Sequence, residues 1–219
     1  MALIENTFGQ GIERAALLMR HSAREFNREI HDLLNPLTDP GRDYCRRFGQ
    51  ALPKSLHVRG YHSPPERCAE TVELVVDTHI TQGGSGSRTR AVESLGVFYG
   101  LDQIKMWQAM QNAGGLPQFI REWGNGNIAS DAMIPADLSA KLIIKSTFDR
   151  LNTAKHKPQL DICVSHDSTL MLIKDQLLGQ KAEEFGVEFL DGVILFEQDE
   201  GIWLQSHHGS AREISALLA

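Results

Sequence analysis

An apolar segment of strand length lies near the start of the chain and stops at charged residues. Residues 15–19 read Ala-Ala-Leu-Leu-Met, and Arg20 and His21 follow directly. Apolar and polar positions do not alternate in this segment, so we predict a strand that is buried on both faces, as in a parallel sheet. A second strand-like run, residues 160–165, reads Leu-Asp-Ile-Cys-Val-Ser and ends in the same way at His166 and Asp167.

Segments with helical periodicity separate the strand-like runs. Helices are predicted over residues 38–52, 67–80, 136–151 and 169–178, and short strands over 56–63, within 90–98, and over 193–196 and 202–205. Gly201 separates the last two strands, which predicts a hairpin. Residues 1–13 are predicted to be a short arm. Strands that alternate with helices are typical of an α/β domain with a mainly parallel sheet.

The pattern changes between about residues 95 and 150. Large apolar residues are interleaved there with Gly114-Gly115, Pro117 and Gly124-Asn125-Gly126. Such interruptions favour short helices joined by loops, followed by the clearer helix at residues 136–151. We therefore predict one domain over residues 1–219, with a small helical cap insert at about 95–150.

Charge and cysteine content narrow the class of partner. The 22 basic and 28 acidic residues give a net charge of −6, which argues against a nucleic-acid partner. No apolar run approaches the roughly 18 to 20 residues of a membrane span, and the first eleven residues do not resemble a secretory signal. The three cysteines are widely spaced, which is typical of reduced thiols in the cytoplasm. We expect a cytoplasmic protein without membrane or nucleic-acid partners.

The two predicted strand ends that carry histidine suggest an anion site. Ligands of parallel sheets bind outside the carboxyl ends of the strands, where the side chains after both runs would emerge. Arg20, Arg24 and Arg67 would surround a phosphate there, with His166 donating to a further oxygen. Histidine can act as a nucleophile, and a carboxylic acid such as Asp167 can protonate a departing alcohol. Such a set of donors needs no metal.

Three motifs carry a resemblance to a known family. Residues 20–24, Arg-His-Ser-Ala-Arg, resemble the Arg-His-Gly-x-Arg signature of the histidine phosphatase superfamily. Residues 63–71 resemble its second motif, Ser-Pro-x-x-Arg-x-x-x-Thr. Residues 165–167, Ser-His-Asp, resemble its third motif in the acid-phosphatase branch. The motifs occur in family order and cover most of the chain, so together they are far more specific than any one of them.

The resemblance implies a fold and a role for each matching residue. The fold would be a three-layer α/β sandwich, with a mainly parallel central sheet flanked by helices and a cap of variable size. His21 would be the phosphorylated nucleophile and Asp167 the proton donor, and the phosphate pocket would consist of Arg20, Arg24, Arg67 and His166. No metal or other cofactor is implied. The substrate would be a small phosphomonoester or a phosphorylated protein side chain.

Two departures from the family pattern leave alternatives open. Ser22 replaces the usual glycine beside the nucleophile, where it would narrow the pocket or add a hydroxyl donor. A chain of this kind could bind a phosphorylated partner without turnover. In the phosphoglycerate mutase branch the proton donor is a glutamate shortly after the second motif, and Glu93 stands near that place. A phosphomutase that uses Glu93 as acid is therefore another alternative.

The remaining histidines do not have the spacing of metal ligands. They are His31, His57, His62, His79, His156 and the pair His207-His208. Surface positions or structural hydrogen bonds are the favoured interpretation for all of them.

Overall fold

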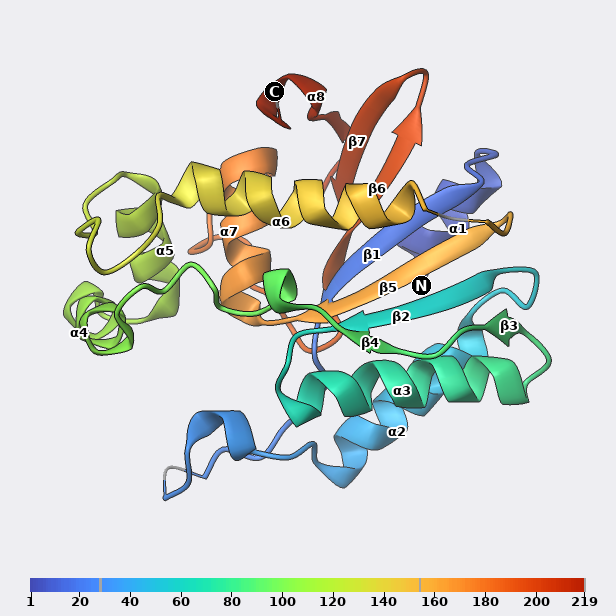
Figure 1. Cartoon of the computed structure of the whole chain (residues 1–219), viewed down its shortest axis with the longest axis horizontal. Helices are drawn as coiled ribbons and strands as arrows, with labels where there is room; N and C mark the ends of the chain where they lie inside the picture. Colours follow the sequence, from blue (N-terminus) through green and yellow to red (C-terminus); the bar gives the residue numbers. More distant parts are fainter. Residues whose placement is uncertain (28, 154, 219) are drawn as a thin grey trace.

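A mixed sheet runs through the middle of the molecule, and helices cover both of its faces (Figure 1). The computed structural model describes residues 1–27, 29–153 and 155–218. Among these residues, eight strands pair in the order β3-β2-β5-β1-β6-β7-β8, and β4 also pairs with β2. The strands are β1 Arg14–Arg20, β2 His57–His62, β3 Ser85–Gly86, β4 Arg90–Ala91, β5 Gln159–Ser165, β6 Gly192–Gln198, β7 Gly201–Ser206 and β8 Arg212–Glu213.

The helices divide between the two faces of the sheet. The α-helices are α1 Ala2–Gly9, α2 Asp39–Ala51, α3 Glu66–Thr81, α4 Gln103–Ala113, α5 Leu116–Gly124, α6 Ala136–Leu151, α7 Asp167–Leu178 and α8 Ser215–Leu218; the 3-10 turns are η1 Asp32–Leu34 and η2 Glu93–Leu95. In Figure 1, α2 and α3 lie on one side of the sheet, and α6 and α7 on the other. The predicted three-layer α/β architecture is confirmed.

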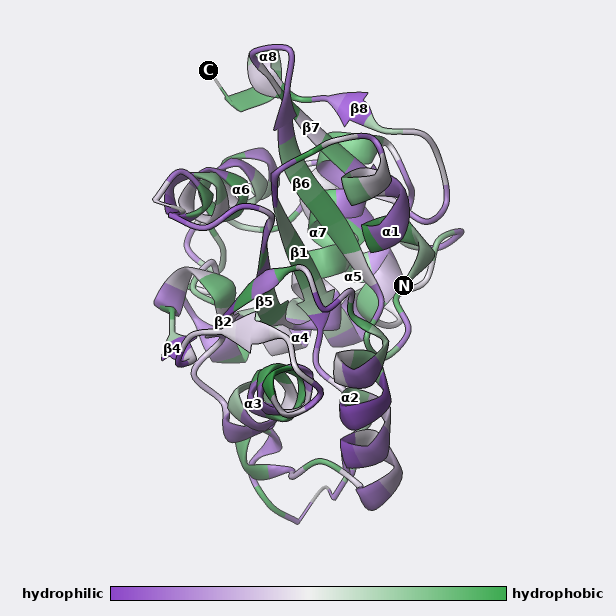
Figure 2. Cartoon of the chain, turned by 90° about the vertical axis from the view of Figure 1, so that its right-hand side faces the viewer, coloured by the Kyte–Doolittle hydropathy of each residue, from purple (hydrophilic) through white to green (hydrophobic). Residues whose placement is uncertain are grey.

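Strand β1 is apolar between its two terminal arginines because both of its faces are covered. Ala16 and Leu18 pack into a cluster with residues of α6 and α7. Ala15, Leu17 and Met19 point to the opposite face and pack with residues of α2 and α3. Figure 2 accordingly shows the hydrophobic colour on the central strands and hydrophilic residues along much of α2. Alternate side chains of one strand thus enter two separate cores.

The register of the central strands brings three chain segments to one edge of the sheet. β1, β5 and β2 are parallel neighbours, with Arg20 opposite Ser165 and His62 opposite Val164. The residues that follow these strands therefore emerge side by side. The outer strands β6, β7 and β8 are antiparallel, and β6 and β7 form the predicted hairpin.

The first residues correct one prediction. Residues 2–9 form helix α1 instead of an arm, and Ile4 and Thr7 are its buried residues. Ile4 packs into the cluster under α2 and α3, and the Thr7 hydroxyl donates to the Leu3 carbonyl at 2.9 Å. A helix of eight residues with two buried positions has too little periodicity to be recognised, and its packing stabilises it.

Helices α4 and α5 lie at one end of the molecule, beyond the ends of β2 and β5, at the left of Figure 1. Helix α6, the last part of the predicted insert, lies along the sheet beside α7 (Figure 1). Within the described ranges, no helix combines the length and the apolar character needed to cross a bilayer.

Candidate active site

The two motif histidines meet at the carboxyl ends of adjacent strands. His21 follows β1 and His166 follows β5, and their ring centroids lie 5.8 Å apart. The His21 amide donates to the Ser165 carbonyl at 3.0 Å, which continues the parallel pairing beyond the last strand residue. The two imidazoles are 2% and 5% exposed. The sequence-based prediction that both emerge at one edge is therefore confirmed.

A backbone contact fixes the orientation of the His21 ring. Its Nδ1 lies 2.8 Å from the Ser22 carbonyl oxygen, which can only accept a hydrogen bond. Nδ1 therefore carries the proton, and Nε2 is the unprotonated nitrogen, which can accept a hydrogen bond. Arg67 Nε donates to Nε2 at 3.2 Å. Burial, with a smaller contribution from the positive charge of Arg67, lowers the pKa of His21 to about 3 against the opposing Ser22 contact. The ring is thus neutral at physiological pH, as a nucleophile requires.

His166 is held beside His21 by the second motif. Its Nε2 lies 2.8 Å from the hydroxyl oxygen of Ser63, which follows β2. Burial, followed by the charge of Arg67, lowers the pKa of His166 to about 4. The residue also occupies the N-cap position of α7, without a capping hydrogen bond from its side chain, at a helix end where the dipole favours negative charge. This end of the sheet therefore suits an anion.

Arg67 and Arg24 both bind one carboxylate. Arg67 lies in the first turn of α3 and is 4% exposed. Its guanidinium donates to the backbone carbonyl of Asp32 at 2.9 Å and contacts the Asp32 carboxylate at 3.3 Å. Arg24 contacts the other oxygen of that carboxylate at 2.7 Å. In this arrangement the two oxygens of Asp32 stand where two phosphate oxygens would bind the same guanidiniums.

Arg20 is fixed by contacts from two other segments. One terminal nitrogen donates to the Val187 carbonyl at 2.7 Å, and the other lies 2.9 Å from the Asp167 carboxylate. The guanidinium carbon lies 4.2 Å from the centre of the Phe189 ring, whose centroid is 6.1 Å from that of His21. Buried Arg20 Nε has no hydrogen-bond partner among the residues that the structure describes.

The two candidate proton donors occupy different surroundings. The Asp167 side chain is 33% exposed, and one of its oxygens pairs with Arg20 while the other accepts from the Ser168 amide. Glu93 is exposed and lies in η2, whose neighbours bind the strand ends: the Val92 amide donates to the His62 carbonyl at 2.8 Å. Both carboxylates therefore belong to segments at the same edge of the sheet.

The Ser22 side chain does not point into the proposed pocket, contrary to what the sequence suggests. It is fully buried, and its hydroxyl donates to the Gly41 carbonyl at 2.7 Å in the first turn of α2. A side-chain carbon on Gly41 would lie 2.2 Å from the Ala23 carbonyl oxygen. The first turn of α2 therefore packs closely against residues 20–24, with no room for a larger residue at Gly41. The expectation that Ser22 narrows the pocket or adds a donor to it is wrong, because the side chain joins the motif to α2.

Sequence reasoning misses Asp32, Val187 and Phe189. Asp32 begins a short 3-10 turn in a polar loop, and the other two belong to the loop before β6. None of the three belongs to a motif. The loop lengths allow many positions for these side chains, and only the folded chain selects one.

Comparisons with known proteins agree with the motifs. Residues 16–204 match the family model of the histidine phosphatase superfamily (branch 1). The chain resembles a solved phosphoglycerate mutase from Bacillus anthracis, with 17% identity and a TM-score of 0.57 over 89% of this chain and 92% of the other. It also resembles a mutant phosphoserine phosphatase from Entamoeba histolytica in complex with phosphoserine (15% identity, TM-score 0.57, 88% and 95% coverage).

A third similar structure is the alpha-ribazole phosphatase from Shigella flexneri, with 18% identity and a TM-score of 0.54 over 88% of this chain and 95% of that one. The sequence matches none of the curated proteins with which it was compared.

Proposed function

Because this chain belongs to the histidine phosphatase superfamily, we propose that it hydrolyses phosphomonoesters through a phosphohistidine at His21. The observation that carries the proposal is the orientation of the His21 ring. Nδ1 is bound to the Ser22 carbonyl, and Nε2 faces the guanidinium of Arg67. A neutral imidazole whose unprotonated Nε2 lies against an anion-binding guanidinium can attack phosphorus once phosphate takes the place of Nε2 on Arg67.

In the first half-reaction, a phosphate group replaces the Asp32 carboxylate on Arg24 and Arg67. His21 Nε2 forms a bond to phosphorus while the bond from phosphorus to the ester oxygen breaks. Arginine and His166 stabilise the charge on the equatorial oxygens, which is the main task of catalysis in phosphoryl transfer. The donors for this step come from the protein, so the proposed reaction uses no metal.

The departing alkoxide takes a proton from a carboxylic acid, and we assign this role to Asp167. It directly follows His166, and its side chain is partly open to solvent. In the second half-reaction the resulting carboxylate accepts a proton from water as the water oxygen attacks phosphorus and the bond to Nε2 breaks. Glu93 is the alternative acid, as the resemblance to the phosphoglycerate mutase branch implies.

The substrate class proposed is a small phosphomonoester, in the cytoplasm. Two structurally similar proteins support this proposal, because one is named a phosphoserine phosphatase and the other an alpha-ribazole phosphatase. Helices α4 and α5 of the predicted cap would select the alcohol portion, because they lie beyond the strand ends that carry the two imidazoles (Figure 1). A phosphorylated protein side chain is the second candidate.

Release of p-nitrophenol from p-nitrophenyl phosphate tests the proposal. The wild-type chain should turn over, and His21→Ala should lose the activity. The control is His57→Ala, because His57 lies at the start of β2, away from the strand end that leads to Ser63 and the candidate site. Acid-labile, alkali-stable phosphate should form on the wild-type chain and be absent from His21→Ala.

Two results would favour the other functions. Phosphate binding without release beyond the His21→Ala background would indicate a non-catalytic phosphate-binding module. Transfer of the labile phosphate to a second hydroxyl instead of water would indicate a mutase.

A further inference from the structure

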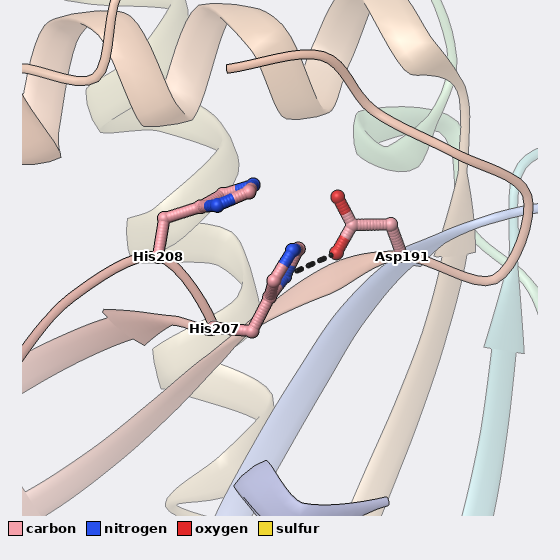
Figure 3. A group of neighbouring side chains, drawn as sticks. All are labelled: Asp191, His207 and His208. Atoms are coloured by element: carbon pink, nitrogen blue, oxygen red, sulfur yellow. Dashed lines mark ion pairs between the residues drawn. The ribbon is translucent and has the colours of Figure 1, made fainter.

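A cluster of potential metal ligands lies where the loop of residues 185–191 meets β6. The same loop contacts the Arg20 side chain through Val187 and Phe189. Asp191, His207 and His208 each offer one ligand atom, and these atoms all lie within 4.8 Å of one another. Figure 3 shows the three side chains converging, with the ion pair between His207 Nδ1 and the Asp191 carboxylate at 2.9 Å. Among the residues that the structure describes, no other group of three histidine, cysteine or acidic side chains meets this condition.

The sheet register explains why residues so far apart in sequence meet. Val193 of β6 pairs with Ser206 of β7 in antiparallel register. Continuing that register by two residues places Asp191 opposite His208, just beyond the last paired residues. All three residues therefore lie just outside the open end of one hairpin, whose paired strands bring them together.

We propose that Asp191, His207 and His208 bind a divalent transition metal ion of the Zn²⁺ class. Two imidazole nitrogens and one carboxylate oxygen form a common ligand set for Zn²⁺, whereas Mg²⁺ and Ca²⁺ prefer oxygen ligands alone. Ligand atoms on a tetrahedral zinc ion lie about 3.3 Å apart, given metal–ligand bonds of about 2.0–2.1 Å. The observed cluster needs only small side-chain movements to reach this geometry. Water would complete the coordination, because both imidazoles are exposed.

The surroundings of Asp191 orient its carboxylate. The Gly192 amide donates to Oδ1 at 2.7 Å. The fully buried ammonium of Lys174 lies 3.4 Å from Oδ2 and donates to the Gly186 carbonyl at 3.0 Å. Such outer contacts hold ligating carboxylates in place in metal sites. Lys174 takes the Oδ2 side and leaves Oδ1, the oxygen nearer His207, for the metal.

A metal ion at this place would fix the loop at residues 185–191 to the hairpin. The Asp191 backbone carbonyl accepts from the Arg20 amide at 2.8 Å, and Val187 and Phe189 of the same loop hold the Arg20 side chain. Leu190 adopts a φ of 61°, which leucine rarely takes, so the loop conformation is strained. The bound ion would oppose relaxation of this loop. The role is structural, and binding does not depend on the proposed phosphatase activity.

Titration with Co²⁺ and Zn²⁺ on the full chain tests the proposal. We expect one Co²⁺ per chain, with the visible absorption of tetrahedral cobalt, and displacement of Co²⁺ by Zn²⁺. His207→Gln and His208→Gln should each weaken binding at least tenfold. Both side chains are exposed, so neither substitution disturbs the core. Asp191→Asn is less informative alone because it leaves buried Lys174 without its ion-pair partner.

The matched control is His57→Gln. His57 and His156 form another close pair of imidazoles, stacked with centroids 3.9 Å apart, but they lie outside the three-residue cluster. Hydrogen exchange gives a second readout: Zn²⁺ should slow exchange in residues 185–191 of the wild-type chain and leave it unchanged in His207→Gln. The proposal is overturned if the wild-type chain fails to bind either ion in the micromolar range, or if both histidine variants bind as the wild type does.

Discussion

Asp32 accepts from Arg67 through both its backbone carbonyl, at 2.9 Å, and its carboxylate, at 3.3 Å. The same Arg67 donates to the Nε2 of His21. An acidic side chain of the protein's own 3-10 turn thus binds a guanidinium that we assign to phosphate. Under the proposed function, substrate phosphate would displace this carboxylate from Arg67.

Replacing Asp32 should strengthen anion binding. Asp32→Asn removes the charge that competes with phosphate for Arg24 and Arg67. The Asp32 side chain is 54% exposed, so each ion pair is worth only a fraction of a kcal/mol, and vanadate should bind about two- to tenfold more tightly. Calorimetry with vanadate measures the change. Asp39→Asn, which breaks an exposed pair with Arg42, is the control. Weaker binding by Asp32→Asn would mean that Asp32 orients the arginines for phosphate.

Arg67→Lys should lower kcat/KM for p-nitrophenyl phosphate about 10²-fold or more. Lysine keeps the positive charge but lacks the planar fork that contacts Asp32 and His21 together. Arg46→Lys, in an exposed pair with Asp43, provides the same chemical change away from the site. Equal kinetics for Arg67→Lys and the wild type would remove Arg67 from the proposed pocket.

The proton donor can be identified by comparing substrates whose leaving groups differ in their need for a proton. A p-nitrophenolate departs with little help, whereas an alkoxide needs a proton. In single-turnover experiments, Asp167→Asn should slow hydrolysis of an alkyl phosphomonoester far more than hydrolysis of p-nitrophenyl phosphate. Glu93→Gln should slow both substrates little. The reverse pattern would assign the acid to Glu93.

Ser22→Gly should reduce stability and leave kcat unchanged. The substitution restores the family's usual glycine but removes the hydroxyl that donates to the Gly41 carbonyl. The lost hydrogen bond and the greater freedom of glycine in the unfolded chain together predict a loss of about 1–2 kcal/mol. Urea denaturation of Ser22→Gly and Ser22→Ala separates the two contributions. A changed kcat would show that the Ser22 hydroxyl acts on the pocket after all.

Acid should destabilise the fold through the two buried imidazoles. Burial lowers the pKa of His21 to about 3 and that of His166 to about 4, whereas both titrate near about 6.5 in the unfolded chain. Between these values the unfolded chain binds more protons than the folded one. The free energy of unfolding therefore falls as pH decreases from about 6.5 towards 4, by on the order of 1 kcal/mol per pH unit for each imidazole.

Urea denaturation at several pH values measures this slope. His166→Gln should show a shallower decline than the wild type, because one buried titrating group is removed. The comparison cancels the contribution of carboxylates common to both chains. Parallel slopes would mean that His166 is not buried in its neutral form.

The sequence by itself predicted the buried central strands and the residues at which they end. Residues 15–19 are apolar without alternation and residues 160–165 are largely so, which predicts cover on both faces, and the parallel register then brings His21 and His166 to one edge. The motifs around Arg20, Arg24 and Arg67 predicted an anion site at that edge, because guanidinium groups are costly to bury without a partner.

Only the tertiary structure decided which side chains and backbone groups contact those residues. Asp32 reaches Arg24 and Arg67 from a loop, Ser22 turns away to Gly41, and His207 meets Asp191 across the end of a hairpin. The periodicity of a strand or helix constrains the directions of its own side chains over a few residues. Contacts between loops depend on how segments far apart in the sequence pack together. A local sequence pattern contains no information on that packing.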